Sequence, residues 1–295
     1  MKTVGGTMKI RRKYVLVFLS VLALTTGCSN PASPPNVSQT AKPAPVVLDS
    51  KRFVVAGSGT NLPITEKLAA AYNKKNNSSI EVPKSIGSDG AIKAVQTGTL
   101  DLGLISRELT AAEKAGGLKE IPYARVGIVF ATHPSTPDND VSLDDILKIH
   151  QGLKTTWSDG GKIVVLIRGK HDSSNLILFP LIPGFEQAID ESLQEKRWQV
   201  MYHDVDMSTA LRNKPGVLGH TDTTDIKINP GIKALTVNGV AATPENIQAG
   251  SYPYSKQLSF VYKDSLSERA KAFVAFATSD EGRGIIVANG GTPSR

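Results

Sequence analysis

Three strand–turn–helix units in succession constrain the fold of this chain more than any other feature of its sequence. Short β-rich runs at residues 52–56, 80–82 and 100–105 alternate with segments whose apolar residues recur at helical spacing. Pro63 suits the first turn of the first helix, because its missing N–H costs nothing there. Strands that alternate with helices in this way form a parallel sheet covered by helices. The sequence therefore predicts an α/β fold.

Small hydroxyl residues follow each of these strands. Ser58 and Thr60 follow the first strand, Ser88 follows the second and Ser106 the third. Ligands of open α/β sheets lie beyond the carboxyl ends of the strands, where helix N-termini present unpaired N–H groups that favour an anion. Gly59 lets the backbone approach such a ligand closely. The alternative is that each hydroxyl only caps a helix, but three such turns on successive strands favour a binding site.

The second half of the chain contains a further strand end of this kind. A strongly β-forming run at residues 123–132 is followed by a buried strand at 162–167, and then by Arg168, Ser173 and Ser174. A helix N-terminus, two hydroxyls and a guanidinium thus meet at one strand end. A guanidinium presents a fixed fork of donors that suits a tetrahedral oxyanion.

Arg168 has a second interpretation, in which it forms a structural ion pair with Asp172 or Asp89. The sequence does not decide between the two. The apolar residues at 176–189 have helical spacing, and they predict one helix after this turn.

The N-terminus resembles a bacterial lipoprotein signal peptide, here residues 1–27. A basic segment and an apolar run at residues 14–24 lead to Cys28, the only cysteine of the chain. The resemblance implies that Cys28 becomes the lipid-bearing N-terminus of a protein anchored in the periplasm or at the cell surface. An ordinary secretory signal is the alternative. The proline-rich and serine-rich residues 28–49 are predicted to be a tether.

The charge and the motifs exclude several classes of function. Five of the 34 basic residues precede Cys28 and no acidic residue does, so 29 basic residues face 27 acidic ones in the rest of the chain. A nearly balanced surface is poorly suited to nucleic acid. The sequence contains no phosphate loop, no nucleophile elbow and no zinc-ligand spacing among its five histidines. We therefore expect no enzymatic activity, no cofactor and no metal.

Several segments in a fixed order carry a resemblance to a known family. They include AGSGTNLPIT (56–65), IGSDGAIKAVQTGTLDLGLISREL (86–109), IVVLIRGKHDSSN (163–175), GVLGHTD (216–222) and AFVAFATSDEGRGIIVANGGTP (272–293). From about residue 52 onward, the chain resembles the type II periplasmic solute-binding proteins, and within them the phosphate-binding lipoproteins of phosphate ABC transporters.

The resemblance implies a two-lobed fold in which each lobe is a mixed, mainly parallel sheet flanked by helices. Lobe 1 is expected at residues 50–131 plus 258–295 and lobe 2 at 132–257. Two hinge strands join the lobes, and the crossings are expected near residues 126–132 and 258–262. The ligand of such a fold lies between the lobes and is buried when they close.

The resemblance also implies a set of anion contacts. These are Ser58, Gly59, Thr60, Ser88 and Ser106 from the first lobe, and Arg168, Ser173 and Ser174 from the second. Two places depart from the pattern of the family. Phosphate binders typically have a Gly-Ser-Gly-Thr type turn after the arginine, where this chain has His-Asp-Ser-Ser-Asn (171–175), and the residue after Ser106 is Arg107. Arg107 stands where several relatives carry the acid that accepts a proton from phosphate, and it either strengthens an oxyanion site or bridges a helix. Asp89 either supplies the acceptor instead or caps its helix, and we favour the cap. Asp172 adds a negative charge unless it pairs with Arg168 or Lys170.

Two functions follow from these observations. In the first, a monomer captures a small oxyanion, inorganic phosphate being favoured, and delivers it to an ABC permease with its ATPase. In the second, an anchored sensor or interaction protein uses the same fold with altered or lost oxyanion binding. The unusual turn at residues 171–175 keeps the second function open.

Overall fold

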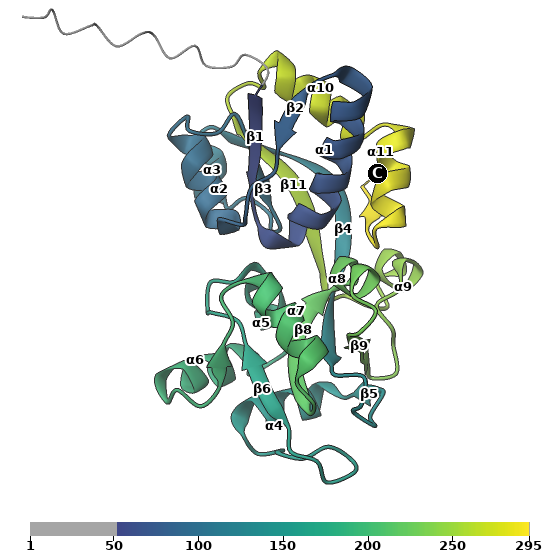
Figure 1. Ribbon diagram of the computed structural model, residues 1–295. Coiled ribbons are helices and arrows are strands. Elements are labelled where there is room, and N and C mark those ends of the chain that lie inside the picture. Colours follow the sequence, from purple (N-terminus) through teal and green to yellow (C-terminus); the bar gives the residue numbers. More distant parts are fainter. Residues whose placement is uncertain (1–51, 295) are drawn as a thin grey trace, which may run out of the picture. The chain divides into compact units, whose positions relative to one another are not determined.

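The computed structural model describes residues 52–294, which form a mixed α/β structure (Figure 1). The predicted signal peptide at 1–27, the predicted lipidation residue Cys28 and the predicted tether at 28–49 lie outside the described residues. Within residues 52–294, no helix combines the length and the apolar character that a membrane span requires.

The first lobe contains the three predicted strand–turn–helix units. Its strands are β1 (Arg52–Gly57), β2 (Ser79–Glu81), β3 (Leu102–Ile105), β11 (Ser255–Lys263), β12 (Thr292–Pro293) and the first part of β4 (Leu118–Thr132). Its helices are the 3-10 turn η1 (Gly59–Asn61), α1 (Leu62–Asn76), α2 (Gly87–Gln96), α3 (Ala111–Ala115), α10 (Glu268–Ala277) and α11 (Asp280–Ala288). Strand β1 pairs in parallel with both β2 and β3, so their carboxyl ends meet at one edge of the sheet. The predicted parallel arrangement is confirmed.

The second lobe repeats this construction. Its strands are β6 (Val164–Ile167), β7 (Gln199–Val200), β8 (Val217–Asp222), β9 (Lys233–Ala234), the end of β4, and the separate pair β5 (Asp140–Val141) and β10 (Thr236–Val237). Its helices are α4 (Leu143–Gln151), α5 (Ser173–Leu181), α6 (Phe185–Gln194), α7 (Asp204–Asn213), α8 (Thr223–Ile228) and α9 (Pro244–Ala249). Strand β6 pairs in parallel with β7 and β8.

Strand β4 passes from one lobe into the other, as Figure 1 shows. It pairs with β11 as far as Gly127 and with β8 from Ile128 onward. The second crossing lies earlier than expected, because residues 258–262 pair with the first part of β4 and, at 259–261, with β3. Strand β11 begins at Ser255, opposite Gly127. The exact limits of the lobes stay a prediction.

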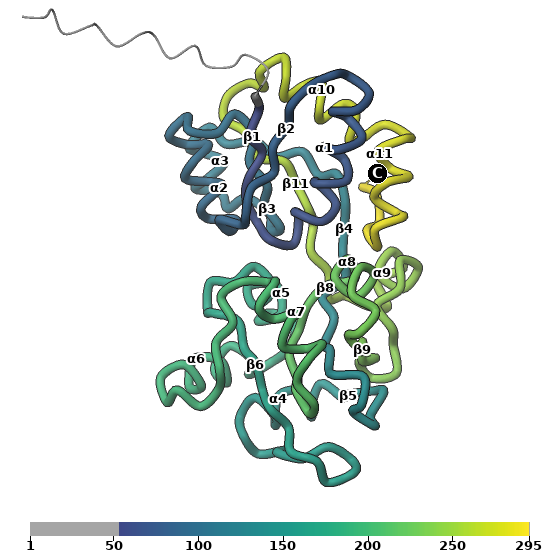
Figure 2. The backbone as a smooth tube through the Cα atoms, viewed as in Figure 1, coloured from purple at the N-terminus to yellow at the C-terminus, as the bar shows by residue number. Residues whose placement is uncertain are grey.

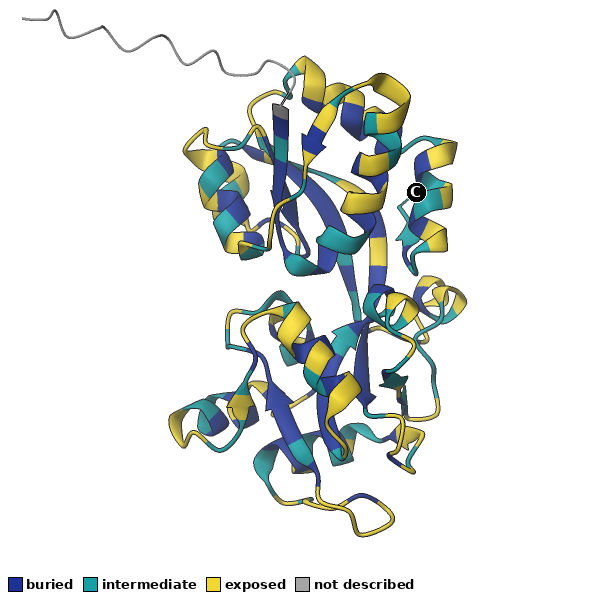
Figure 3. Cartoon of the chain, viewed as in Figure 1, coloured by how far each residue is buried: buried dark blue, intermediate teal, exposed yellow. Residues whose placement is uncertain are grey.

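Each lobe has its own apolar core, formed by strands that are buried under helices (Figure 3). In the first lobe, Tyr123 of β4 stacks on Phe260 of β11 with ring centroids 4.4 Å apart. Phe273 and Phe276 of α10 meet the edge of Tyr72 in α1. The C-terminal segment therefore returns to the first lobe, as the chain trace in Figure 2 also shows.

Two elements differ from the sequence-based expectation. The single helix predicted over residues 176–189 is two helices, because Pro183 keeps Ile182 extended and Gly184 adopts a left-handed φ of 83° between them. Strand β4 begins at Leu118, ahead of the expected start at residue 123. Pro122 within it is accommodated at an irregularity in the β4–β11 register.

Candidate functional site

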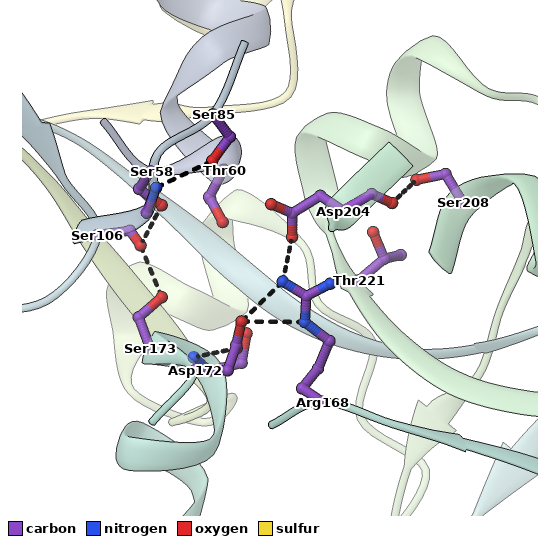
Figure 4. Close-up of polar contacts among 12 residues, drawn as sticks. Ser58, Thr60, Ser85, Ser106, Arg168, Asp172, Ser173, Asp204, Ser208 and Thr221 are labelled. Atoms are coloured by element: carbon purple, nitrogen blue, oxygen red, sulfur yellow. Dashed lines mark hydrogen bonds and ion pairs between the residues drawn. The ribbon is translucent and has the colours of Figure 1, made fainter. Parts of the chain in front are cut away.

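The hydroxyls that follow the strands of the first lobe lie in contact with one another. The Oγ atoms of Ser58 and Ser106 are 2.7 Å apart, and the backbone N–H of Ser106 donates to Oγ of Ser88 at 3.2 Å. The Oγ of Ser106 is also 2.8 Å from Oγ of Ser173, which opens α5 of the second lobe. Figure 4 shows this chain of hydroxyls running from one lobe to the other.

Helix capping does not explain these hydroxyls. Ser58 occupies the N-cap position of η1, but its side chain makes no capping hydrogen bond. Helix α2 begins at Gly87 with Ile86 in the N-cap position, so Ser88 lies inside the helix. The side chain that caps α5 is Asp172, whose carboxylate accepts from the backbone N–H of Ser174 at 2.9 Å.

These side chains surround a cavity of about 290 Å³ that both lobes line. The sequence-predicted residues that line it are Ser58, Gly59, Thr60, Ser88, Asp89, Arg107, Arg168 and Ser173. Ser106 and Ser174 are outside this lining. Ser106 is fully buried behind Ser58 and Ser173, and the backbone of Ser174 bonds to Asp172.

Arg168 is the main cation of the cavity, and it is only 5% exposed. Its Nε and Nη2 atoms both donate to Oδ2 of Asp172, at 2.9 and 2.8 Å. Burial acts to raise the pKa of Asp172, but the charges of Arg168 and Lys256 outweigh burial and hold that pKa far below its usual value. Among the described residues, the buried Nη1 of Arg168 has no hydrogen-bond partner. The ion pair with Asp172 thus leaves one buried donor of Arg168 unpaired.

A second carboxylate, that of Asp204, approaches Arg168 from the start of α7. Its Oδ1 lies 3.3 Å from Nη2 of Arg168 (Figure 4). The same carboxylate reaches the turn of the other lobe, because a Cβ added at Gly59 would lie 1.9 Å from its Oδ2. Glycine at this position permits that close approach. The cavity therefore holds two carboxylates and a guanidinium that both of them contact.

Arg107 and Asp89 form a bridge at the rim of the cavity. Arg107 donates to both carboxylate oxygens of Glu113, at 2.9 and 2.8 Å, and to Asp89 at 2.9 Å. The hydrogen bonds from Arg107 lower the pKa of Glu113 to about 2. Two roles were considered for Arg107. The geometry shows that Arg107 bridges helices α2 and α3. The cap expected from Asp89 is wrong, because Ile86 holds the N-cap position and Asp89 pairs with Arg107.

The described residues contain no cluster of three or more side chains of the metal-ligating types. Lys170 is not the partner of Asp172, because the Nζ atom of Lys170 donates to Asp190 at 2.6 Å. The groups that line the cavity are thus hydroxyls, the buried guanidinium of Arg168 and the carboxylates of Asp172 and Asp204, with Arg107, Asp89, His171 and His203 also in the lining. Such a set binds an anion of small size through hydrogen bonds from neutral donors and one charged donor.

Comparison with known proteins supports the same family. A family model described as the PBP superfamily domain matches residues 29–281. The chain belongs to the PBP superfamily. The resemblance to periplasmic solute-binding proteins is thereby confirmed, together with the two-lobed fold.

Individual relatives of this PBP superfamily chain carry related names. The chain is 34% identical to phosphate-binding protein PstS 2 of Streptococcus agalactiae, over 41% of this chain and 42% of that protein, so the match spans about two fifths of the relative. It is 24% identical to phosphate-binding protein PstS of Borreliella burgdorferi, over 95% of this chain and 98% of that one. A crystal structure of a phosphate ABC transporter substrate-binding protein with bound phosphate, from Clostridium perfringens, is 28% identical and has a TM-score of 0.75. The match covers 83% of this chain and 100% of the Clostridium perfringens chain.

Among the residues absent from the sequence-based prediction, Asp204 lines the cavity, and three others are buried polar residues, namely His220, Asp222 and Lys256. Burial lowers the pKa of His220 to about 3 and raises that of Asp222 to about 7. Asp204 comes shortly after strand β7 and opens helix α7. This is the same strand–turn–helix pattern that predicted the other site residues, so the sequence contained a signal for Asp204. Nothing in the sequence around Lys256, Ser-Lys-Gln-Leu, distinguishes it from an exposed strand lysine.

Proposed function

We propose that this PBP superfamily chain is an extracytoplasmic solute-binding protein that captures inorganic phosphate between its lobes and delivers it to an ABC transporter. The observation that carries the proposal is the cavity itself. Hydroxyls from β1, β3 and α5 lie beside the buried Arg168, whose Nη1 has no partner among the described residues. Such a buried donor costs free energy unless a ligand satisfies it.

The carboxylates favour phosphate over sulfate. Phosphate retains at least one proton at neutral pH and can donate a hydrogen bond to a carboxylate, whereas sulfate carries no proton and meets only repulsion. Asp172 already accepts from Arg168 and from the N–H of Ser174. Asp204 contacts Arg168 less closely and also lines the cavity. We therefore assign the acceptor role to Asp204, in place of the acid expected at the position of Arg107.

The relatives named phosphate-binding proteins and the phosphate-bound structure from Clostridium perfringens support this choice of ligand. We further propose that the protein acts as a monomer, without catalytic activity, and that lipid on Cys28 anchors it to a bacterial membrane. The partners would be a permease and its ATPase. Membrane fractionation of wild-type protein and of Cys28→Ser tests the anchor, and equal membrane association of both would contradict it.

Thermal unfolding in the presence of anions tests the ligand. A ligand that binds only the folded state stabilises it by about 2.7 kcal/mol at one hundred times its dissociation constant. We expect millimolar phosphate to raise the melting temperature, and sulfate or molybdate at the same ionic strength to raise it much less. If no oxyanion at millimolar concentration changes the melting temperature, phosphate capture is wrong and an anchored sensor or interaction protein becomes the better interpretation.

A further inference from the structure

A buried lysine from the second hinge strand contacts the turn that follows β1. Lys256 lies in β11 and is 3% exposed, and its Nζ donates to Oγ1 of Thr60 at 2.8 Å. Thr60 lines the anion cavity. Figure 4 shows the Thr60 hydroxyl directed toward the space between the serines and Arg168. Lys256 is therefore outside the cavity lining but contacts a residue that belongs to it.

This contact determines which way the hydroxyl of Thr60 can donate. An ammonium has only donors, so Oγ1 of Thr60 must be the acceptor of the bond from Lys256. Within residues 52–294 the Thr60 hydroxyl has no other hydrogen-bond partner. Its own proton is consequently free to be donated to a guest in the cavity.

Among the residues that the structure describes, no carboxylate lies within ion-pair distance of the Lys256 ammonium. In the described part of the chain, Lys256 forms no ion pair, and its hydrogen bond goes to a neutral hydroxyl. Its charge acts on the buried carboxyl groups of Asp172 and Asp222 and favours a lower pKa in both. Burial raises the pKa of Asp222 to about 7, and Lys256 opposes that rise. A buried charge is costly unless it is paired, and Asp172 and Asp222 act on Lys256 only from beyond ion-pair distance, so a bound anion would add to the compensation of its charge.

We propose that Lys256 is a second cationic residue of the anion site. It orients the Thr60 hydroxyl toward the bound oxyanion, and its charge offsets the negative charge that the ligand brings between two carboxylates. This inference rests on the proposed function, since it concerns the same cavity. Arg168 is shared between Asp172 and Asp204, and Arg107 is paired with Glu113 and Asp89, so further positive charge favours a doubly charged anion.

Titration calorimetry with inorganic phosphate on three variants tests the proposal. Lys256→Met should weaken phosphate binding about ten- to a hundredfold, the range expected when a buried charged hydrogen-bond partner is lost. Lys263→Met is the matched control, because it removes the same charge from the exposed end of the same strand. It should leave the affinity within about twofold. Thr60→Val should weaken binding about tenfold.

The combination of Lys256→Met with Thr60→Val distinguishes orientation from bulk charge. Because part of the effect of Lys256 passes through Thr60, the double variant should lose less affinity than the product of the two single losses. Melting without phosphate shows whether each variant is folded. If Lys256→Met does not fold, Thr60→Ser and Thr60→Val carry the test. Serine keeps the oriented hydroxyl and valine lacks it. The serine variant should therefore bind phosphate at least fivefold more tightly than the valine variant, which is roughly the contribution of one hydrogen bond.

The outcomes separate the inference from the function on which it rests. If Lys256→Met binds phosphate as tightly as the wild-type protein does, the role of Lys256 is wrong and the proposed function still stands. Equal affinity of the Thr60→Ser and Thr60→Val variants would lead to the same conclusion. Failure of the wild-type protein to bind any oxyanion would overturn the proposed function and this inference with it.

Discussion

At the scale of single residues, the donors of Arg168 are of two kinds. Asp172 accepts from the Nε and Nη2 atoms of Arg168, whereas the buried Nη1 has no hydrogen-bond partner among the described residues. Arg168→Ala therefore removes a ligand contact and also leaves a buried carboxylate unpaired. Breaking a buried ion pair in this way typically costs roughly 3–5 kcal/mol of stability.

We predict that Arg168→Ala lowers the free energy of unfolding by about that amount and abolishes the phosphate-dependent change in melting temperature. Adding Asp172→Asn removes the unpaired charge and keeps an N-capping side chain for α5. The double variant should thus regain most of the stability and none of the phosphate response. A phosphate response that survives in the double variant would mean that Arg168 is only structural.

The core residue His150 gives a pH-dependent prediction. Burial lowers the pKa of this histidine to about 4, from an ordinary value of 6.5. Between those two pH values the unfolded chain binds a proton that the folded chain does not, so stability falls as the pH falls. One such proton changes the slope by up to about 1.4 kcal/mol per pH unit.

We expect urea unfolding of His150→Gln, measured between pH 7.5 and 5, to show a weaker loss of stability on acidification than the wild-type protein. The variant is less stable at neutral pH, because it disturbs the contact with Phe185, so the slope is the informative quantity. Identical slopes for the two proteins would contradict the assignment.

The sequence predicted the residues that lie at strand ends better than it predicted those that reach the cavity from elsewhere. Ser58, Ser88 and Ser106 follow directly from the α/β pattern, because the carboxyl ends of parallel strands meet at one edge. Asp204 and Lys256 depend on how α7 and β11 are placed in space. A local pattern holds no information about that placement.

At the scale of elements, the turn η1 and the start of α7 determine the width of the cavity. The two elements come from different lobes and meet where Gly59 faces the Asp204 carboxylate. Strand and turn positions were predictable here, but the break between α5 and α6 was not recognised, although Pro183 and Gly184 mark it. The early start of β4 was missed because Pro122 suggests the end of a strand.

Gly59→Ala tests this contact. The new Cβ would displace the Asp204 carboxylate, which is the end of a flexible side chain, so we predict little change in stability without ligand. We predict that phosphate binding becomes about tenfold weaker, which corresponds to the loss of one hydrogen bond between phosphate and Asp204. We also predict poorer discrimination against sulfate. Gly284→Ala in α11 is the control, since a Cβ there meets nothing within 4 Å. Unaltered binding and discrimination in Gly59→Ala would exclude Asp204 as the acceptor.

At the scale of the whole molecule, two separate cores share the strand β4 and enclose a site to which each contributes. The first lobe supplies the hydroxyls of Ser58 and Thr60, and the second supplies the hydroxyl of Ser173, the Arg168 guanidinium and the carboxylates of Asp172 and Asp204. Neither set is sufficient alone to hold an anion away from water. The family's two-lobed architecture was evident from the order of the motifs, whereas the contacts between the lobes became visible only in three dimensions.

Titration of the wild-type protein with phosphate and with sulfate, by calorimetry at neutral pH and fixed ionic strength, is the most direct measurement. Phosphate should bind at a stoichiometry of one and roughly a hundredfold more tightly than sulfate, because only phosphate can donate a hydrogen bond to the charged Asp204 carboxylate. Equal affinities for the two anions, or heat from neither, would contradict the account.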